Sequence, residues 1–398
     1  MFFGRETLIP SRKNGETEMK KCVVISDSFK GTLSSTEICE IAKRAIKAVF
    51  PRCEVVALPV ADGGEGTAEC FISALGAEKV NVTASGPYGE KITAFYARYN
   101  DTAVIEMAAA AGLPMVGENK NPEKTTTFGV GEMIADAVKC GARNILLGLG
   151  GTCTNDGGCG CCAALGVKFF DENGESFVPT GETLSKIAKI DTKNAEKTLK
   201  NVQISAMCDV TNPFFGRDGA AFIFAPQKGA DDAAVLRLDN GLRALDRVFD
   251  ANLGVKCENM PGSGAAGGMG GGIAAMLKAR LRPGIEAVLD TLCFDEQIKG
   301  ADLIITGEGR VDSQSVCGKV ISGVCARAEK QNIPVIAIAG SIAPSAESVY
   351  EKGITAVFGT DREAKGFPKC AENAAENYEK TLLDVLRLIK TSESFRKS

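Results

Sequence analysis

The alternation of β-rich runs and amphipathic helices at both ends of the chain constrains the fold most strongly. Near the start, an apolar run at 22–26 leads to a helix that Ser34 and Glu37 open as a capping box. A second run at 55–60 precedes a helix at 67–75. Strands that alternate with helices predict a parallel, doubly wound sheet with functional loops at the carboxyl ends of the strands. The same pattern recurs near the end, with runs at 302–306, 334–339 and 354–358 and helices at 319–330, 346–352 and 371–389.

The middle of the chain has a different pattern, in which short runs are separated by turn residues such as Gly86-Pro87 and Asn100-Asp101. Such spacing predicts an antiparallel or mixed sheet. The expected elements are strands at 80–84, 92–98, 103–106, 144–149 and 202–208, a helix at 127–140 and a partly helical segment at 262–279.

A mixed section between two similar α/β sections indicates two α/β domains, one inserted into the other. We expect a disordered leader at 1–18 and a discontinuous Rossmann- or flavodoxin-like domain at 19–80 and 290–398. The inserted α/β domain is expected at 81–289.

Composition excludes several classes of protein. The net charge of −4 argues against a nucleic-acid surface, and no apolar run reaches the ~18 residues that span a bilayer. The leader has no signal-peptide core, and the 15 scattered cysteines are typical of a reduced cytoplasmic protein. A metal site at 159–162 is the alternative for the densest cysteine cluster. It lacks a second cysteine pair and any histidine, so packing at a helix start is favoured.

Glycine-rich loops that carry acids follow several of the runs, in a chain without histidine. Glycine lets backbone N–H groups approach an anion, and carboxylates can hold Mg²⁺ or take a proton. Because the chain has no histidine, a general base must be Asp, Glu, Lys, Cys or Tyr. The loops at 61–67, 150–158 and 307–312 together indicate phosphate chemistry.

These loops differ in how strongly they indicate function. Three glycines with Asp62 and Glu65 exceed what a plain turn needs, and the acids and arginine of 307–315 are unusual for a surface loop. Asp156 and Lys30 fit a functional role and an ordinary turn equally well. The segments around Asp209 and at 226–229 fit polar turns slightly better.

Two segments look like nucleotide-binding motifs but do not meet the requirements of those motifs. The G-x-G-x-x-G pattern at 262–267 does not follow a strand, as a dinucleotide site requires. Gly318-Lys319 lacks both the upstream glycine and the following Ser or Thr of a Walker A loop.

Several long motifs resemble the type 1 glycerate kinases of bacteria over about residues 19–390. The resemblance implies two α/β domains, one inserted in the other, with an active site in the cleft between them. It also implies phosphorylation of D-glycerate, usually at the 2-hydroxyl, with ATP and Mg²⁺. Cys153, Cys159 and Cys161 depart from the family's small or apolar residues, and the leader has no counterpart. The matching motifs lie at 27–35, 59–67, 150–158, 208–213, 225–230, 262–268 and 307–315.

Roles for the site residues follow by chemical type. Asp312 or Asp209 would orient the attacking hydroxyl, and exchanging any two acids fits the sequence equally well. Lys30, Arg310 and Lys319 would neutralise phosphate or carboxylate. Asp62, Glu65 and Asp156 are the candidates for Mg²⁺ or hydroxyl contacts, and the remaining substrate or phosphate contacts would come from Gly63, Gly64, Gly151, Asn155 and Glu308.

Two alternatives remain open. A non-catalytic receptor for a small hydroxy acid could use the same loops, although its surplus acids would repel an anion unless metal were present. Within the enzymes, the alternatives are a kinase for a related sugar acid or transfer to the 3-hydroxyl. The expected partners are D-glycerate and ATP, with neither nucleic acid nor membrane, and the sequence leaves a homo-oligomer open.

Overall fold

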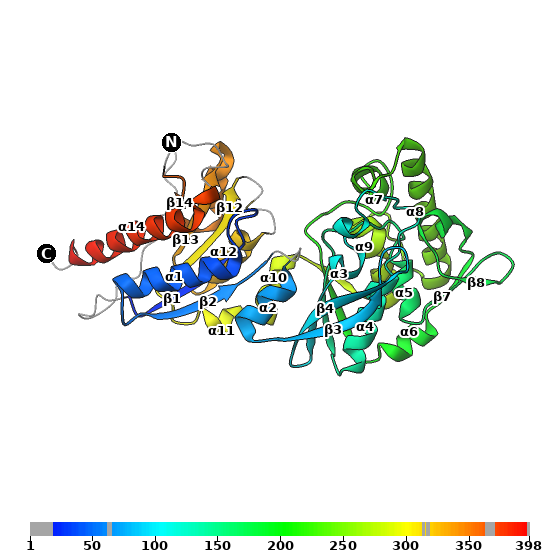
Figure 1. Ribbon diagram of the computed structural model, residues 1–398, viewed down its shortest axis with the longest axis horizontal. Coiled ribbons are helices and arrows are strands. Elements are labelled where there is room, and N and C mark those ends of the chain that lie inside the picture. Colours follow the sequence, from blue (N-terminus) through cyan, green and yellow to red (C-terminus); the bar gives the residue numbers. More distant parts are fainter. Residues whose placement is uncertain (1–18, 62–65, 313–314, 316–318, 363–370, 396–398) are drawn as a thin grey trace. The chain divides into compact units, whose positions relative to one another are not determined.

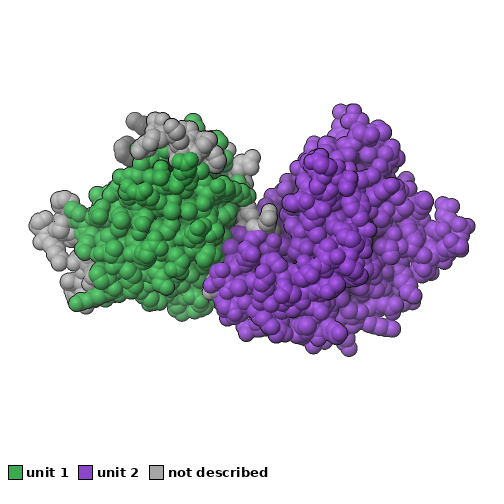
Figure 2. Space-filling view, viewed as in Figure 1, with its two compact units in different colours: residues 1–60, 292–398 green, residues 61–291 purple. Residues whose placement is uncertain are grey.

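The computed structural model describes residues 19–61, 66–312, 315, 319–362 and 371–395. The chain divides into two compact units, which are considered separately below (Figure 2). The first unit comprises residues 1–60 and 292–398, and the second comprises residues 61–291. Within the described ranges, no helix combines the length and apolar character needed to cross a membrane.

The first unit contains a five-stranded sheet in which every neighbouring pair is parallel (Figure 1). Strands from the two ends of the chain meet at its centre, where Cys22 is aligned with Leu303. The expectation of a parallel α/β sheet is therefore confirmed. The strand order is β14 (Ile354–Gly359), β13 (Val335–Ile342), β12 (Leu303–Val311), β1 (Lys21–Ser26) and β2 (Glu54–Pro59).

Helix α1 (Ser35–Val49) begins with the capping box that the sequence predicts. The Glu37 N–H donates to Ser34 Oγ at 3.2 Å, and the Ser34 N–H donates to the Glu37 carboxylate at 2.8 Å. These bonds satisfy N–H groups that have no partner within the helix. The apolar face of α1 then packs with α14 (Ala374–Phe395) and with one face of the sheet.

Helices cover both faces of this sheet. Cys22 and Val24 of β1 join the cluster formed with α1 and α14. The alternate residues Val23 and Ile25 are also buried, and they point to the opposite face. Helix α12 (Val320–Lys330) packs against β12. The unit also contains α11 (Phe294–Gln297) and a 3₁₀ segment, η5 (Pro344–Lys352), where the sequence indicated an α-helix.

Strand β12 is longer than expected, because residues 307–311 continue the strand instead of opening a loop. Gly307 is aligned with Ile338 and Arg310 with Ser341 of β13. A Cβ atom on Gly307 would lie 2.0 Å from the Ile338 carbonyl oxygen. This glycine therefore permits close contact between strands, and it is not a turn residue.

The second unit contains the mixed sheet that the turn spacing predicted. Strands β3 to β5 pair in antiparallel fashion, and β5, β6, β10 and β11 pair in parallel. The strand order is β11 (Arg280–Arg282), β10 (Gln203–Met207), β6 (Asn144–Gly148), β5 (Thr102–Glu106), β4 (Lys91–Tyr99) and β3 (Glu78–Ser85).

Helix α2 (Thr67–Leu75) ends at Gly76, where φ is +64°, as the sequence suggested. It packs against β4 and β5, which are strands of the second unit. The compact unit accordingly starts at Ala61, whereas the sequence placed a domain boundary near residue 80.

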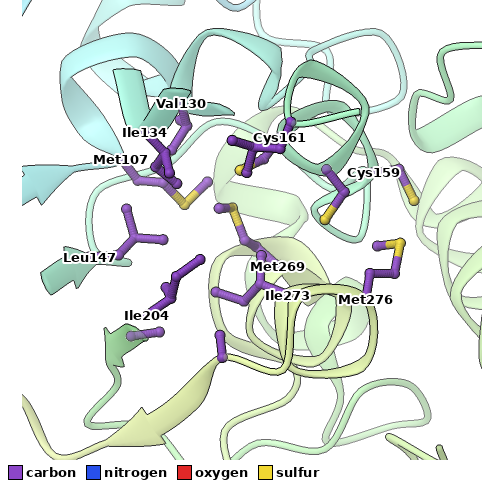
Figure 3. Close-up of a cluster of buried hydrophobic side chains, with 14 of the residues drawn as sticks. Met107, Val130, Ile134, Leu147, Cys159, Cys161, Ile204, Met269, Ile273 and Met276 are labelled. Atoms are coloured by element: carbon purple, nitrogen blue, oxygen red, sulfur yellow. The ribbon is translucent and has the colours of Figure 1, made fainter. Parts of the chain in front are cut away.

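In the core of the second unit, helices pack against the sheet (Figure 3). Met107, Leu147 and Ile204 lie opposite Met269 and Ile273 in this core. The packing helices include α4 (Phe128–Lys139), α5 (Cys159–Ala164), α8 (Asp232–Leu253) and α9 (Ala265–Leu277). The shorter elements are α3 (Ala108–Ala111), η1 (Leu113–Val116), β7 (Lys168–Phe170), β8 (Ser176–Phe177), η2 (Gly181–Lys186), β9 (Lys189–Asp191), α6 (Lys193–Thr198), α7 (Ala220–Phe224), η3 (Pro226–Lys228) and α10 (Gly284–Thr291).

The cysteine cluster at the start of α5 belongs to this core. Cys159, Cys161 and Cys162 are all buried, and burial raises the pKa of each thiol. Among the described residues, no group of three or more His, Cys, Asp or Glu side chains could hold a metal ion. The geometry agrees with packing at a helix start.

Candidate functional site

In the first unit, the loop after β1 lies directly on the backbone of β12. The Asp27 N–H and the Ser26 hydroxyl both donate to the Gly307 carbonyl oxygen at 2.9 Å. A Cβ atom on Gly309 would lie 3.2 Å from Cα of Phe29. The glycines of β12 therefore let the loop that carries Lys30 approach the strand closely.

Three candidate side chains follow one face of β12 at alternate positions, because side chains two residues apart in a strand share a face. Glu308 is buried, whereas Arg310 is largely exposed. The Arg310 Nε atom lies 3.9 Å from Asp312 Oδ2. The end of this strand thus carries an ion pair beside a buried carboxyl group.

The other two cations of the first unit lie at helix-associated positions. Lys30 is exposed in the loop before α1, and its backbone nitrogen lies 3.4 Å from where a Cβ on Gly309 would be. Lys319 is the N-cap residue of α12. Both lysines could meet an anion, since helix N-termini favour negative charge.

In the second unit, Asp156 is completely buried and fastens the 150–158 loop to two helices. Its carboxylate accepts hydrogen bonds from the Thr127 N–H and hydroxyl, both at 2.8 Å, and from the N–H groups of Gly158 at 3.0 Å and Gly160 at 3.2 Å. Burial raises the pKa of Asp156, and these hydrogen bonds oppose that increase. The geometry favours a positioning role over the expected contact with Mg²⁺, because both carboxylate oxygens already accept protein donors.

The same loop contains polar groups without partners. Asn155 is fully buried, and neither its amide oxygen nor its amide nitrogen forms a hydrogen bond with any described residue. The Thr154 hydroxyl likewise has no partner within the described part of the chain. Gly151 has φ of +72° and accepts a backbone hydrogen bond from Leu113 at 2.8 Å.

Lys228 contacts the 150–158 loop, whereas the sequence favoured a polar turn for the segment that carries it. It is only 2% exposed, and its Nζ donates to the Thr154 carbonyl oxygen at 2.7 Å and to the Thr152 hydroxyl at 3.3 Å. Burial lowers the pKa of Lys228 to about 8, although the charges of Cys153 and Asp156 oppose this effect. A lysine in a short Pro-Gln-Lys-Gly segment carries no sequence signal of burial.

Two further loops of the second unit contact the 150–158 segment or each other. A Cβ on Gly267 would lie 2.1 Å from the Thr154 carbonyl oxygen, and the Gly157 N–H donates to the Gly267 carbonyl at 3.1 Å. The Gly264 N–H donates to the Asn212 carbonyl at 3.0 Å. The apparent dinucleotide motif is therefore a tight backbone turn that packs against the loop after β6.

Asp209, the other candidate base, is exposed at the end of β10. Its Oδ1 accepts a hydrogen bond from the Gly284 N–H at 2.8 Å, at the start of α10. Asp209 and Asn155 belong to the second unit, and Asp312 belongs to the first. The structure thus distributes the predicted residues over both units.

The predicted residues Asp62, Gly63, Gly64 and Glu65 lie outside the described part of the chain. The backbone that follows them is held by Glu106, at the end of β5. Its carboxylate accepts hydrogen bonds from the N–H groups of Gly66 at 3.2 Å and Ala68 at 2.7 Å. Sequence reasoning missed Glu106, which a strand-end position alone could have suggested.

Parallel strands with lysine, arginine and carboxylate groups at or just beyond their carboxyl ends are typical of α/β phosphotransferases. Residues 22–390 match the glycerate kinase family, and the chain belongs to this family.

Individual relatives agree over nearly the whole chain. The sequence is 45% identical to a glycerate kinase of Bacillus cereus over 373 residues, which cover 93% of this chain and 98% of that protein. It is 45% identical to the glycerate 2-kinase of Escherichia coli over 341 residues, or 85% of this chain and 90% of that protein. A crystal structure of a glycerate kinase 2 from Salmonella typhimurium LT2 superposes with a TM-score of 0.86 at 39% identity, covering 95% of this chain and all of that one.

Proposed function

We propose that the protein transfers the γ-phosphoryl group of ATP to the 2-hydroxyl of D-glycerate, giving 2-phosphoglycerate and ADP. Phosphorylation of glycerate, with ATP as donor, follows from membership of the family. The 2-position is supported by the glycerate 2-kinase of Escherichia coli, which is 45% identical. The structural observation that carries the proposal is the pairing of Arg310 with Asp312 at the end of β12.

The proposed mechanism relies on positioning and charge neutralisation, because in-line phosphoryl transfer asks little covalent chemistry of the protein. Arg310 would face the transferred phosphoryl group, and Lys30 and Lys319 would neutralise other phosphate or carboxylate charges. Asp312 would accept the hydrogen bond of the attacking hydroxyl. We favour it over Asp209, because Arg310, the proposed contact of the transferred phosphoryl group, lies beside Asp312.

Mg²⁺ is part of the proposal as the partner of ATP. A magnesium ion that arrives with a nucleotide needs only one or two protein carboxylates, because phosphates and waters supply the other oxygens. Asp62 and Glu65 remain the predicted ligands, and bound Mg²⁺ would neutralise charge on the transferred phosphoryl group.

The assignment of the base is tested with Asp312→Asn and Asp209→Asn. If Asp312 orients the hydroxyl, its substitution should lower kcat by about 10²–10⁴-fold with a smaller effect on KM. Asp209→Asn should change kcat far less, and Asp232→Asn in the first turn of α8 serves as a control. Unchanged kcat in Asp312→Asn would refute the assignment.

The reaction itself is tested by ATP-dependent loss of D-glycerate, coupled to ADP release, with ³¹P NMR of the product. The expected product is 2-phosphoglycerate. A signal of 3-phosphoglycerate would instead show transfer to the 3-hydroxyl. Binding of glycerate without ADP release would show a receptor, and turnover only with a larger sugar acid would show a related kinase.

A further inference from the structure

Lys228 lies in surroundings that are unusual for a lysine. Lysine is almost never fully buried unless a carboxylate pairs with it. Here the Nζ atom contacts two neutral oxygens, those of Thr154 and Thr152, and no described carboxylate lies within ion-pair distance. One of its three N–H groups therefore has no acceptor among the described residues.

Unsatisfied polar groups also occur on the residue whose carbonyl accepts the Lys228 hydrogen bond and on the residue that follows it. Lys228 donates a hydrogen bond to the carbonyl of Thr154, and the following residue is Asn155, whose buried amide has no partner among the described residues. The buried Thr154 hydroxyl has none among them either. Native proteins satisfy nearly all such groups, so three of them at one place call for an explanation.

The loop that carries these groups is held by contacts on both sides. It is therefore not a loosely packed surface segment. Asp156 makes four hydrogen bonds to the starts of α4 and α5. On the other side, the Gly267 backbone is so close that a Cβ there would lie 2.1 Å from the Thr154 carbonyl. The loop is thus held while the Thr154 and Asn155 side chains have no hydrogen-bond partner among the described residues.

We propose that Lys228, Asn155 and Thr154 form an oxyanion subsite in the second unit, which takes a carboxylate or phosphoryl oxygen. A positive charge with amide and hydroxyl donors is the combination that recognises such an oxygen. The identity of the anion rests on the proposed function, because D-glycerate supplies a carboxylate and ATP supplies phosphates.

The main test compares ligand binding by wild type, Lys228→Met and the control Lys200→Met, which removes one exposed positive charge from the same unit. Calorimetry is performed with D-glycerate alone and with a non-hydrolysable ATP analogue alone. Lys228→Met should weaken one ligand at least 10-fold and the other less than twofold. Weaker glycerate indicates a carboxylate subsite, and a weaker analogue indicates a phosphoryl subsite.

Asn155→Leu tests the subsite through stability as well as binding. Because the Asn155 amide has no hydrogen-bond partner in the described ranges, an apolar side chain of similar size should raise Tm while weakening the same ligand as Lys228→Met. If the Asn155 amide instead stabilises the fold, Asn155→Leu should lower Tm. This variant also keeps the proposal testable if Lys228→Met does not fold.

Proton uptake provides a third readout. A bound anion favours the charged lysine, so binding at pH 8.5 should take up a proton in wild type and not in Lys228→Met. The other titratable groups whose charges act on Lys228 are Cys153 and Asp156, and both remain in the variant. The proton difference between the two proteins therefore isolates Lys228.

Unchanged binding of both ligands in folded Lys228→Met and Asn155→Leu would overturn the subsite, as would equal weakening of both ligands. Failure of the proposed function is a separate result, in which wild type consumes no glycerate. In that case inorganic phosphate is the probe, and the subsite requires that Lys228→Met weaken its binding at least 10-fold.

Discussion

Replacement of Lys228 by methionine should reveal the cost of burying a positive charge in the second unit. Burial lowers the pKa of Lys228 from its ordinary value of 10.5 to about 8. The difference between these values, at roughly 1.4 kcal/mol per pH unit, corresponds to about 3 kcal/mol of free energy. Lys228 is only 2% exposed, so solvent screens little of this effect.

The sign follows from proton binding. Below about pH 8 both the folded and the unfolded chain carry the lysine proton, and the folded state bears the full cost of burial. Between about pH 8 and 10.5 the folded state loses this proton first, so the unfolded state binds more protons and wild-type stability rises relative to the variant. Cys153, whose pKa burial raises from 9.0 to about 11, stays largely protonated in the folded state over this window, and its titration in the unfolded state is common to wild type and variant.

The assay is urea unfolding of wild type, Lys228→Met and Lys200→Met, followed by circular dichroism at several pH values between 7 and 10. The free energy of unfolding of Lys228→Met minus that of wild type should decrease by roughly 2–3 kcal/mol over this range. Loss of the hydrogen bond to the Thr154 carbonyl shifts this difference in the free energy of unfolding by a constant amount. It does not change how the difference varies with pH. A difference that stays constant within about 0.5 kcal/mol would refute the reasoning. Lys200→Met should show no such trend.

Three further substitutions test other parts of the structure. Gly307→Ala would place a Cβ 2.0 Å from a backbone oxygen, so urea unfolding should show a loss of about 1–3 kcal/mol or more. Its control is Gly359→Ala, whose Cβ would meet a side chain at an ordinary 3.5 Å and change stability by less than about 0.5 kcal/mol. Asp156→Asn replaces one acceptor oxygen with an NH2 donor that faces backbone N–H donors, and thermal unfolding should show a loss of about 2–4 kcal/mol. Ser34→Ala should cost about 1 kcal/mol in the same measurement. It should also raise the pKa of Glu37, which hydrogen bonds from Ser34 lower, as seen in an NMR titration.

The fold could be predicted where one local pattern determines the outcome. The capping box at Ser34 and the spacing of apolar residues after it define α1, and both are observed. The long helix α8 was not predicted, although Asp231 at its N-cap and its buried apolar residues at helical spacing carry the signal. The extent of β12 could not be predicted, because Gly307 is a strand residue only through its pairing with Ile338.

Less of the candidate site could be predicted, because it depends on contacts distant in sequence. The sequence marks the 150–158 loop, yet Asp156 is indistinguishable from a metal ligand until its bonds to Thr127 are known. The importance of Lys228 depends on its burial against Thr154, 74 residues away. The roles assigned to Asp312 and Asp209 remain predictions.

The discontinuity of the first unit has a consequence for synthesis on the ribosome. Strand β1 pairs with β2 on one side and with β12 on the other, and all of residues 61–291 are made between β2 and β12. At bacterial and eukaryotic elongation rates this interval lasts roughly ten to fifty seconds. The second unit is contiguous and can fold during that time, while Val23 and Ile25 still lack the strand that will cover their edge. The nascent amino-terminal segment therefore keeps an unpaired strand edge until β12 is made, and such edges favour aggregation.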